Sequence, residues 1–168
     1  MTSSFCRWIP FCGAATKETK QQLAASGKND AYVWRASYLP VLNLYSRFVY
    51  HEDGDFSDLR WGLAEWKSIN RYLLCEFYPL TPWHCREDTK GFTAHLYFDP
   101  EDGTGILLAF RQEACREEEL LLALPKDLLG AVDFCDVDTG ECVTATDGRL
   151  TLRFDSPRSA KLLKFSVR

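Results

Sequence analysis

The chain has 168 residues, of which 46% are hydrophobic and 26% are charged, and its net charge is −4. It is too short for a complete (β/α)₈ barrel, which needs about 250 residues, but long enough to bury a substantial core. The mixed charge excludes general disorder and the basic footprint of a nucleic-acid-binding protein. No stretch approaches the roughly 18 apolar residues that span a bilayer, so we expect neither a nucleic-acid nor a membrane partner.

The cysteines and the N-terminus indicate the cellular compartment. Seven is an odd number of cysteines, so they cannot all pair within one chain, and no CxxC motif is present. Most of them, including Cys135 and Cys142, lie in apolar runs, where a free cysteine behaves as a small buried hydrophobe. No long apolar run follows a basic start, so no signal peptide is visible. We therefore expect reduced cysteines and a cytoplasmic location.

The composition divides the chain into two parts. Residues 1–75 carry nine basic and seven acidic residues, a net charge of +2, whereas residues 76–168 carry eleven and seventeen, a net charge of −6. All five tryptophans and six of the seven tyrosines lie before residue 84. We therefore expect two segments of different origin, 1–75 and 76–168, with the boundary near Tyr72–Trp83.

The first part begins with a short apolar and aromatic run. Residues 5–13 have the length of a buried strand and end in Gly13, which predicts a turn into a loop. The polar residues 16–29 predict a short helix or a surface loop. Residues 30–40 are dense in aromatics but show no clean period.

A helix is predicted over residues 56–74, with Asp55 as its N-cap. Apolar side chains recur every three or four residues and define one face, so this face must pack on an apolar surface. They are Leu59, Leu63, Trp66, Ile69 and Leu73. Polar side chains, Glu65 among them, mostly take the opposite face. Pro79 and Pro82 prevent the helix from continuing.

After Gly91 the period of the apolar residues changes to two. The expected strands are Phe92–Phe98, Ile106–Arg111, Glu118–Leu124, Ala131–Val137, Glu141–Ala145, Leu150–Phe154 and Ala160–Val167. Seven short strands separated by turn residues predict an antiparallel sandwich or barrel. Because a sandwich buries one face of each sheet, the alternation on the first strand predicts that His95 faces solvent.

No catalytic constellation is recognisable. The histidines are His51, His84 and His95, and His84-Cys85 is the only adjacent His/Cys pair, whereas a zinc site needs about four ligands in close pairs. The acidic residues cluster in turns rather than as two carboxylates facing each other across a cleft. We expect no catalytic residue, no metal and no cofactor in this chain.

Aromatic residues in the first half form a belt that could contact a sugar. They are Trp8, Tyr32, Trp34, Tyr38 and Trp83, and Arg35 stands beside them in the sequence. Flat apolar rings suit sugar rings, and a guanidinium can donate hydrogen bonds to hydroxyls. Large aromatics also dominate ordinary packing between two domains. Both interpretations remain open.

Five segments of the chain occur in the order of a known family. They are Trp8–Gly13 (WIPFCG), Asp30–Ser37 (DAYVWRAS), Glu76–Trp83 (EFYPLTPW), Leu108–Arg111 (LAFR) and Asp136–Glu141 (DVDTGE). Together they resemble α-galactosidase-like enzymes, glycoside hydrolase family 36 in the broad sense. The resembling features are the last barrel strand, a Y-x-F-R-S stretch, a DFYPLTPY-type junction, a VLAFRR strand and a DLDTGE hairpin. Two departures are Glu76, which replaces an aspartate, and Ala36, which interrupts the Arg-Ser pair, so no role is transferred to Glu76.

The resemblance implies an α+β architecture in which the last strand and helix of a (β/α)₈ barrel precede a C-terminal antiparallel β-sandwich. It also implies a retaining α-glycosidase whose catalytic aspartates lie on earlier barrel strands. Four residues match positions at the barrel mouth, where active sites of this fold are built, and are expected to contact substrate. They are Trp8, Cys12, Tyr32 and Arg35.

The resulting hypothesis is that the chain is the C-terminal portion of an α-galactosidase-like glycoside hydrolase that acts on α-linked glycosides and is inactive alone. Its expected partner is an α-galactoside-like carbohydrate, once the rest of the barrel is supplied. The alternative is a stand-alone β-sandwich that binds carbohydrate or serves only as a scaffold. As a scaffold it would support a barrel or mediate the formation of a homo-oligomer.

Overall fold

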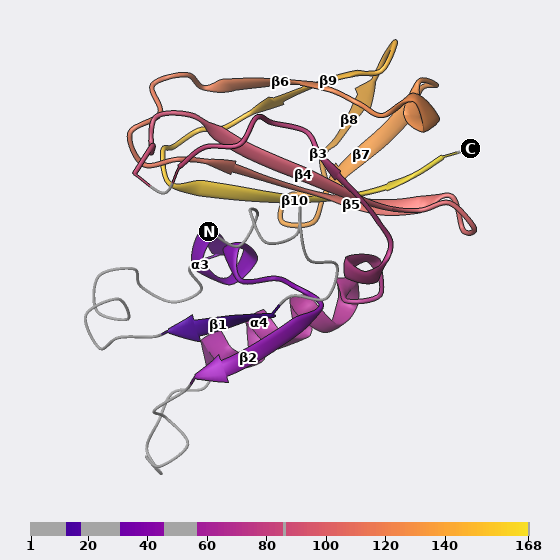
Figure 1. Ribbon diagram of the computed structural model, residues 1–168. Helices are drawn as coiled ribbons and strands as arrows, with labels where there is room; N and C mark the ends of the chain where they lie inside the picture. Colours follow the sequence, from indigo (N-terminus) through magenta and orange to yellow (C-terminus); the bar gives the residue numbers. More distant parts are fainter. Residues whose placement is uncertain (1–12, 18–30, 46–56, 86, 168) are drawn as a thin grey trace.

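The computed structural model describes residues 13–17, 31–45, 57–85 and 87–167. Within these residues, helices and three sheets form successive layers (Figure 1). The parallel pair consists of β1 (Gly13–Lys17) and β2 (Val41–Tyr45). The helical layer consists of α3 (Ala31–Ala36), α4 (Ser57–Ile69) and the 3₁₀ helix η2 (Tyr72–Leu74).

The sandwich contains the other two sheets. The central sheet is antiparallel throughout, and its strands in spatial order are β3 (Glu76–Pro79), β4 (Phe92–Asp99), β5 (Thr104–Arg111), β10 (Ser159–Ser166), β7 (Val132–Asp136) and β8 (Cys142–Ala145). The outer sheet pairs β6 (Glu119–Ala123) with β9 (Arg149–Arg153), and the 3₁₀ helix η3 (Lys126–Leu128) follows β6. The predicted antiparallel sandwich is therefore confirmed, and each of the seven expected strands is found within one or two residues of its expected bounds.

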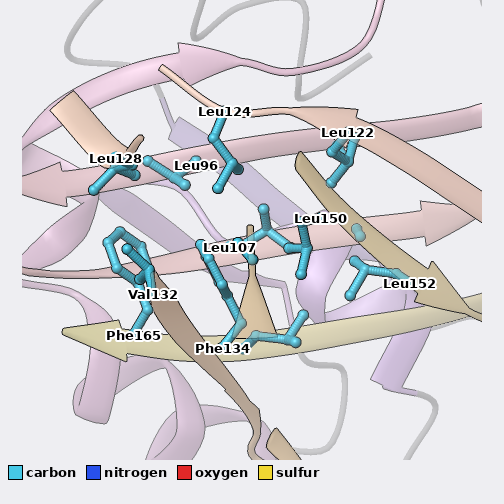
Figure 2. Packing of buried hydrophobic residues seen from close by; sticks show 14 of the residues in the cluster. Leu96, Leu107, Leu122, Leu124, Leu128, Val132, Phe134, Leu150, Leu152 and Phe165 are labelled. Atoms are coloured by element: carbon cyan, nitrogen blue, oxygen red, sulfur yellow. The ribbon is translucent and has the colours of Figure 1, made fainter. Parts of the chain in front are cut away.

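The core of the sandwich lies between the central and outer sheets (Figure 2). On the outer sheet the residues alternate between buried and exposed, so Leu120, Leu122, Leu150 and Leu152 all point inward. They meet the inward side chains of the central sheet, such as Leu107. Each fully buried side chain of this size contributes about 1.5–3 kcal/mol, so this core holds the two sheets together.

The opposite face of the central sheet is buried as well. Tyr97, Ile106, Leu108, Phe110 and Leu162 point away from the outer sheet and form a second cluster with the helical layer. The helical layer contributes Trp34, Tyr38, Ile69, Tyr72 and Leu73 to this cluster. Most residues of β4 and β5 are consequently buried without alternation, because both faces of the sheet are covered by other layers.

The expectation that His95 faces solvent is wrong. Its side chain is on the helical side of β4, and the residue is only 7% exposed. The centroid of its ring lies 5.7–6.0 Å from the ring centroids of Phe77, Tyr97 and Phe110. The alternation on β4 predicts a polar face because sequence periodicity does not show that a second layer covers that face.

The first part of the chain contains the predicted helix and elements that the sequence did not indicate. The helix expected over 56–74 is present as α4 and η2. Gly13 opens strand β1 rather than a loop, and residues 30–40, which lacked a period, contain α3. The rest of the strand expected over 5–13 and the N-cap Asp55 lie outside the described residues. None of the helices in the described ranges is long and apolar enough to span a bilayer.

Cys135 and Cys142 form a disulfide, which corrects the expectation that they are reduced. They stand opposite each other on the antiparallel strands β7 and β8, so their side chains project from the same face. Cys142 is exposed and Cys135 half-buried, unlike the small buried hydrophobes expected there. Cys75, Cys85 and Cys115 are free thiols.

The packing of α3 on α4 yields a test. Gly62 is buried in α4, and a Cβ atom added there would overlap the indole ring of Trp34. Alanine is the better helix former, but the overlap forces the ring to move. We expect Gly62→Ala to lower the free energy of unfolding by about 1–3 kcal/mol in urea titrations.

The matched control is Gly130→Ala. This glycine is exposed, and no described atom lies within 4 Å of the added Cβ. The control should leave stability unchanged or raise it by about 0.4–1 kcal/mol. Equal effects of the two substitutions would contradict the close packing of Trp34 on α4.

Candidate functional site

The described residues that were predicted to contact substrate both lie on α3. Tyr32 is half-buried, and Arg35 is 1% exposed. Trp8 and Cys12 lie outside the described residues. Helix α3 packs against β10 of the central sheet, so both side chains are placed between the helical layer and the sandwich.

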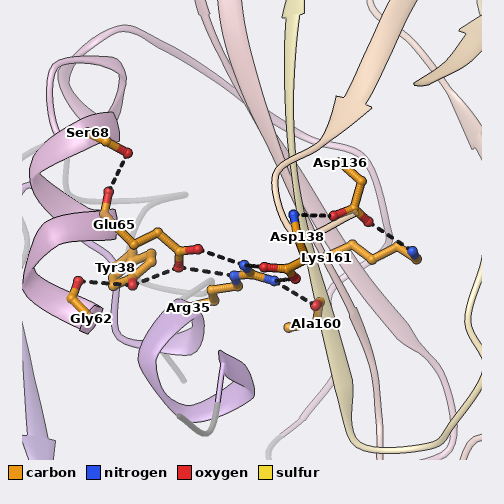
Figure 3. Close-up of polar contacts among 9 residues, drawn as sticks. All are labelled: Arg35, Tyr38, Gly62, Glu65, Ser68, Asp136, Asp138, Ala160 and Lys161. Atoms are coloured by element: carbon orange, nitrogen blue, oxygen red, sulfur yellow. Dashed lines mark hydrogen bonds and ion pairs between the residues drawn. The ribbon is translucent and has the colours of Figure 1, made fainter. Parts of the chain in front are cut away.

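Arg35 joins three parts of the chain through hydrogen bonds (Figure 3). Its Nε and Nη2 atoms donate to the carboxylate of Glu65 on α4, at 3.1 and 2.6 Å. Its Nη1 and Nη2 atoms donate to the carboxylate of Asp138, in the turn between β7 and β8, at 2.7 Å each. Nη1 also donates to the carbonyl oxygen of Ala160 on β10 at 2.9 Å. A guanidinium has five N–H groups, and all five are used.

The charges around Arg35 compensate its burial. The side chain of Glu65 is 11% exposed and that of Asp138 is 48% exposed. Burial disfavours the charged guanidinium, but the hydrogen bonds and charges of Asp138 and Glu65 more than offset this effect, so the pKa of Arg35 is raised above its ordinary value. Bidentate pairs of this type are shorter and stronger than neutral hydrogen bonds and fix the orientation of both partners.

Tyr38 supports Glu65 from the helical side. Its hydroxyl lies 2.8 Å from Oε2 of Glu65 and 3.1 Å from the carbonyl oxygen of Gly62, and it can donate its proton to either. Burial raises the pKa of Tyr38, and the negative charge of Glu65 raises it further. Tyr38 therefore stays protonated and helps to hold Glu65 toward Arg35.

Asp136 and Lys161 support Asp138 from the sandwich side. Oδ1 of Asp136 accepts a hydrogen bond from the backbone N–H of Asp138 at 2.9 Å. Oδ2 of Asp136 accepts one from Nζ of Lys161 on β10, also at 2.9 Å. A continuous set of polar contacts thus runs from the sandwich to α4. We call this set the Arg35 network; it comprises Arg35, Tyr38, Glu65, Asp136, Asp138 and Lys161.

Tyr32 makes a second contact between α3 and the sandwich. Its hydroxyl donates to Oε1 of Gln112 at 2.9 Å, and its ring meets that of Phe110 edge-on, with the centroids 5.7 Å apart. The guanidinium of Arg158 lies 5.3 Å from the Tyr32 ring centroid. Tyr32 and Arg35 together fix both the position and the rotation of α3 on the sheet.

These contacts bear on the two interpretations of the aromatic belt. Arg35 has no N–H group left for a sugar hydroxyl in this structure. Trp34 and Tyr38 are 4% and 1% exposed, as ordinary packing between two layers requires, whereas Trp83 is 59% exposed. Within the described chain, the belt is therefore mostly part of the contact between the helical layer and the sandwich.

Apart from Arg35 and Tyr38, the sequence alone indicates no member of this network as a functional residue. Glu65 was placed on the polar face of its helix, and its partner Arg35 is 30 residues away. Asp136 and Asp138 belong to the DVDTGE segment, which indicates a hairpin and contributes to the family resemblance but assigns no role to either carboxylate. The signal that could have found them is the pair of carboxylates where β7 ends and the turn begins: Asp136 is buried, and Asp138 is half-exposed in the turn.

Histidine, cysteine and acidic side chains also lie outside the Arg35 network. Among the described residues, no group of three His, Cys, Asp or Glu side chains could hold a metal ion. His84 Nδ1 lies 3.1 Å from Oδ2 of Asp88, and Glu76 accepts a hydrogen bond from the Tyr78 hydroxyl at 2.5 Å, both at the surface. Active sites of β/α units form after the carboxyl ends of their strands. The segments that follow the carboxyl ends of β1 and β2 are residues 18–30 and 46–56, which lie outside the described ranges.

The Arg35 network predicts an order of mutational effects. Glu65→Gln removes the more buried of the two carboxylate charges, so we expect it to lower the free energy of unfolding by about 2–4 kcal/mol. Asp138→Asn removes the half-exposed charge, and screening by solvent reduces its effect to about 1–2 kcal/mol. Urea titrations with an unchanged m value measure both.

A surface ion pair provides the control for these variants. Arg71 and Asp102 lie 2.9 Å apart, with side chains 56% and 53% exposed. Asp102→Asn should change stability by no more than about 0.5 kcal/mol. An effect of Glu65→Gln as small as that of the control would contradict the structural role of the network.

The raised pKa of Tyr38 predicts a loss of stability in alkali. Above pH 10, the ordinary pKa of tyrosine, the unfolded chain releases the Tyr38 proton while the folded protein keeps it. The folded state then binds more protons, so the free energy of unfolding falls as pH rises. Tyr38→Phe should remove up to about 1.4 kcal/mol per pH unit from this slope. Equal slopes in the two proteins between pH 10 and about 11.5, measured by urea titration, would contradict the assignment.

Comparison with known proteins identifies similar folds. The galactosidase domain of AgaSK, an α-galactosidase–sucrose kinase, superposes with a TM-score of 0.61 and 11% identity, over 92% of this chain and 22% of that chain. A GH27 β-L-arabinopyranosidase from Geobacillus stearothermophilus in complex with arabinose gives a TM-score of 0.49 and 15% identity, over 83% of this chain and 31% of that chain. AmyP in complex with maltotriose gives a TM-score of 0.43 and 13% identity, over 71% of this chain and 23% of that chain. Neither protein-family profiles nor curated proteins give a match.

The first of these similarities includes both the helical layer and the sandwich, because 92% of the chain is aligned. The chain spans about a fifth of the length of that protein. The resemblance to α-galactosidase-like enzymes is thus confirmed at the level of fold: the chain has the architecture of one part of the AgaSK galactosidase domain.

Proposed function

We propose that the chain is the C-terminal portion of an α-galactosidase-like glycoside hydrolase that acts on α-linked glycosides. In this proposal, residues 1–75 are the end of a catalytic (β/α)₈ barrel and residues 76–168 are the C-terminal sandwich. The observation that carries the proposal is the superposition on the galactosidase domain of AgaSK over 92% of this chain, together with the motif order in the sequence.

The parallel pair supports the assignment of residues 1–75. Strands β1 and β2 run parallel, α3 lies between them in the chain, and α4 follows β2. Parallel strands require a crossover connection and occur almost only in sheets covered by helices. A sheet of two strands is at best marginally stable, so further barrel strands are expected beside this pair.

The sandwich acts as a support for the barrel in this proposal. The Arg35 network and the apolar cluster fix α3 and α4 to the central sheet. Helices that pack around a barrel determine where its strands and loops lie. The sandwich therefore holds the end of the barrel in place without taking part in bond cleavage.

The substrate belongs at the carboxyl ends of the barrel strands. For β1 and β2 the following segments are residues 18–30 and 46–56, and an α-galactoside-like carbohydrate is the proposed partner. Trp8 and Cys12 remain proposed substrate contacts. The contacts of Tyr32 and Arg35 with the sandwich favour a role for these two residues in joining the layers.

A stand-alone carbohydrate-binding sandwich is the second candidate, and one observation favours it. Trp83 follows β3 and is 59% exposed, so part of its indole surface is accessible to a sugar ring. Titration of tryptophan fluorescence with galactose and with an α-galactoside distinguishes the candidates. The main proposal predicts no saturable change for this chain, and the second predicts one that Trp83→Ala abolishes.

The main proposal is tested by hydrolysis of an aryl α-galactoside. We expect no release of the aryl alcohol by the purified chain, with the AgaSK galactosidase domain as the positive control in the same assay. We expect the genomic DNA upstream of Met1 to encode further β/α units in frame, and the joined protein to hydrolyse the substrate. Turnover by the chain alone, or an inactive joined protein, would contradict the proposal.

A further inference from the structure

The disulfide and the Arg35 network meet in one hairpin. Cys135 and Cys142 are opposite each other on β7 and β8, at the point where the hairpin tip, residues 136–141, begins and ends. The tip carries Asp138, which binds Arg35. In the central sheet β8 is the edge strand and pairs with β7 alone. The crosslink therefore joins the edge strand to β7 at the base of the turn that carries Asp138.

Hydrogen bonds inside the tip depend on the closure of the hairpin. The backbone N–H of Asp136 donates to the carbonyl of Glu141 at 2.8 Å, and that of Gly140 donates to the carbonyl of Asp136 at 2.8 Å. Asp136 in turn accepts from the N–H of Asp138. The position of the Asp138 carboxylate thus depends on the alignment of β7 with β8, which the antiparallel ladder and the disulfide hold together.

The disulfide is open to chemistry from solvent. Cys142 is exposed, as are Gly140, Glu141 and Val143 around it. Thiol–disulfide exchange requires that an attacking thiolate reach one of the two sulfurs. Access from the solvent side of β8 meets this requirement, whereas the free thiol of Cys115 is buried.

We propose that the Cys135–Cys142 disulfide makes the contact between the helical layer and the sandwich sensitive to redox conditions. A dithiol reductant, protein or small molecule, breaks the S–S bond through a mixed disulfide. It supplies two electrons and two protons, leaving two cysteine thiols and its own disulfide. Without the crosslink the tip samples more conformations, and Asp138 spends less time in its bidentate contact with Arg35.

The charge arrangement allows this loosening without unfolding. When Asp138 moves away, Arg35 keeps its bidentate contact with Glu65 and its bond to the Ala160 carbonyl. No unpaired buried charge is created, so the protein stays folded while α3 is held less tightly. This inference concerns the junction between the layers and does not rest on the proposed hydrolase function.

Amide hydrogen exchange of the oxidised and the dithiothreitol-treated protein tests the proposal. We expect residues 31–36 of α3 to exchange roughly tenfold faster after reduction, as the loss of one charge-assisted contact implies. Strands β4 and β5, in the middle of the sandwich, serve as the internal reference and should not change. Mass spectrometry after alkylation verifies the state of the two cysteines.

Three variants identify the cause of the change. The Cys135→Ser/Cys142→Ser protein should show fast exchange in α3 with or without the dithiol. Asp138→Asn should also show fast exchange, and reduction should add nothing, because the contact is already weakened. Cys85→Ser, which alters an exposed free thiol, should respond as the natural protein does.

Three results would overturn the proposal. The first is unchanged exchange in α3 after complete reduction of the disulfide. The second is a response of Asp138→Asn to the dithiol as large as that of the natural protein. If the protein is purified with two thiols at Cys135 and Cys142, it is first treated with an oxidised dithiol reagent to form the disulfide. Failure to form the disulfide under this treatment is the third result that would overturn the proposal. The first result is obtained on the natural protein, so it does not depend on the folding of any variant.

Discussion

Arg35 places a positive charge where almost no water reaches it, at 1% exposure. A buried charge is costly unless it is paired and its hydrogen bonds are satisfied. Glu65 comes from the helical layer, and Asp138 and the Ala160 carbonyl come from the sandwich. Arg35 is therefore fully satisfied only when the two layers are in contact. The apolar cluster between the layers supplies the buried area, and the contacts of Arg35 and Tyr32 fix how the two layers fit together.

The parts of the fold that repeat locally could be predicted from the sequence. The strands after residue 91 follow from alternation and turn residues, and α4 follows from its apolar face. His95, Glu65 and α3 could not be predicted correctly, because their surroundings come from distant segments. Arg35 and Asp138 are 103 residues apart, and no periodic pattern relates them. A six-residue helix such as α3 is also too short to show a period.

The DVDTGE hairpin connects the sequence resemblance with the physics of the junction. Asp136 orders the turn, Asp138 binds Arg35, and Gly140 adopts a φ of 74°, which favours glycine. The disulfide closes this same turn. The segment that resembles a glycosidase hairpin is thus the segment that holds the helices on the sandwich. This agrees with a sandwich that supports the end of a catalytic barrel.

The central claim is that the helical layer is held on the sandwich through Arg35. Three of the five tryptophans, Trp34, Trp61 and Trp66, lie in the helical layer. Eight of the ten described strands belong to the sandwich, so it dominates the β-sheet signal in circular dichroism. In urea, the natural protein should lose both signals in one coincident transition. In Arg35→Met, the fluorescence should change at a lower urea concentration than the β-sheet signal. Coincident transitions at the same midpoint in both proteins would contradict this account.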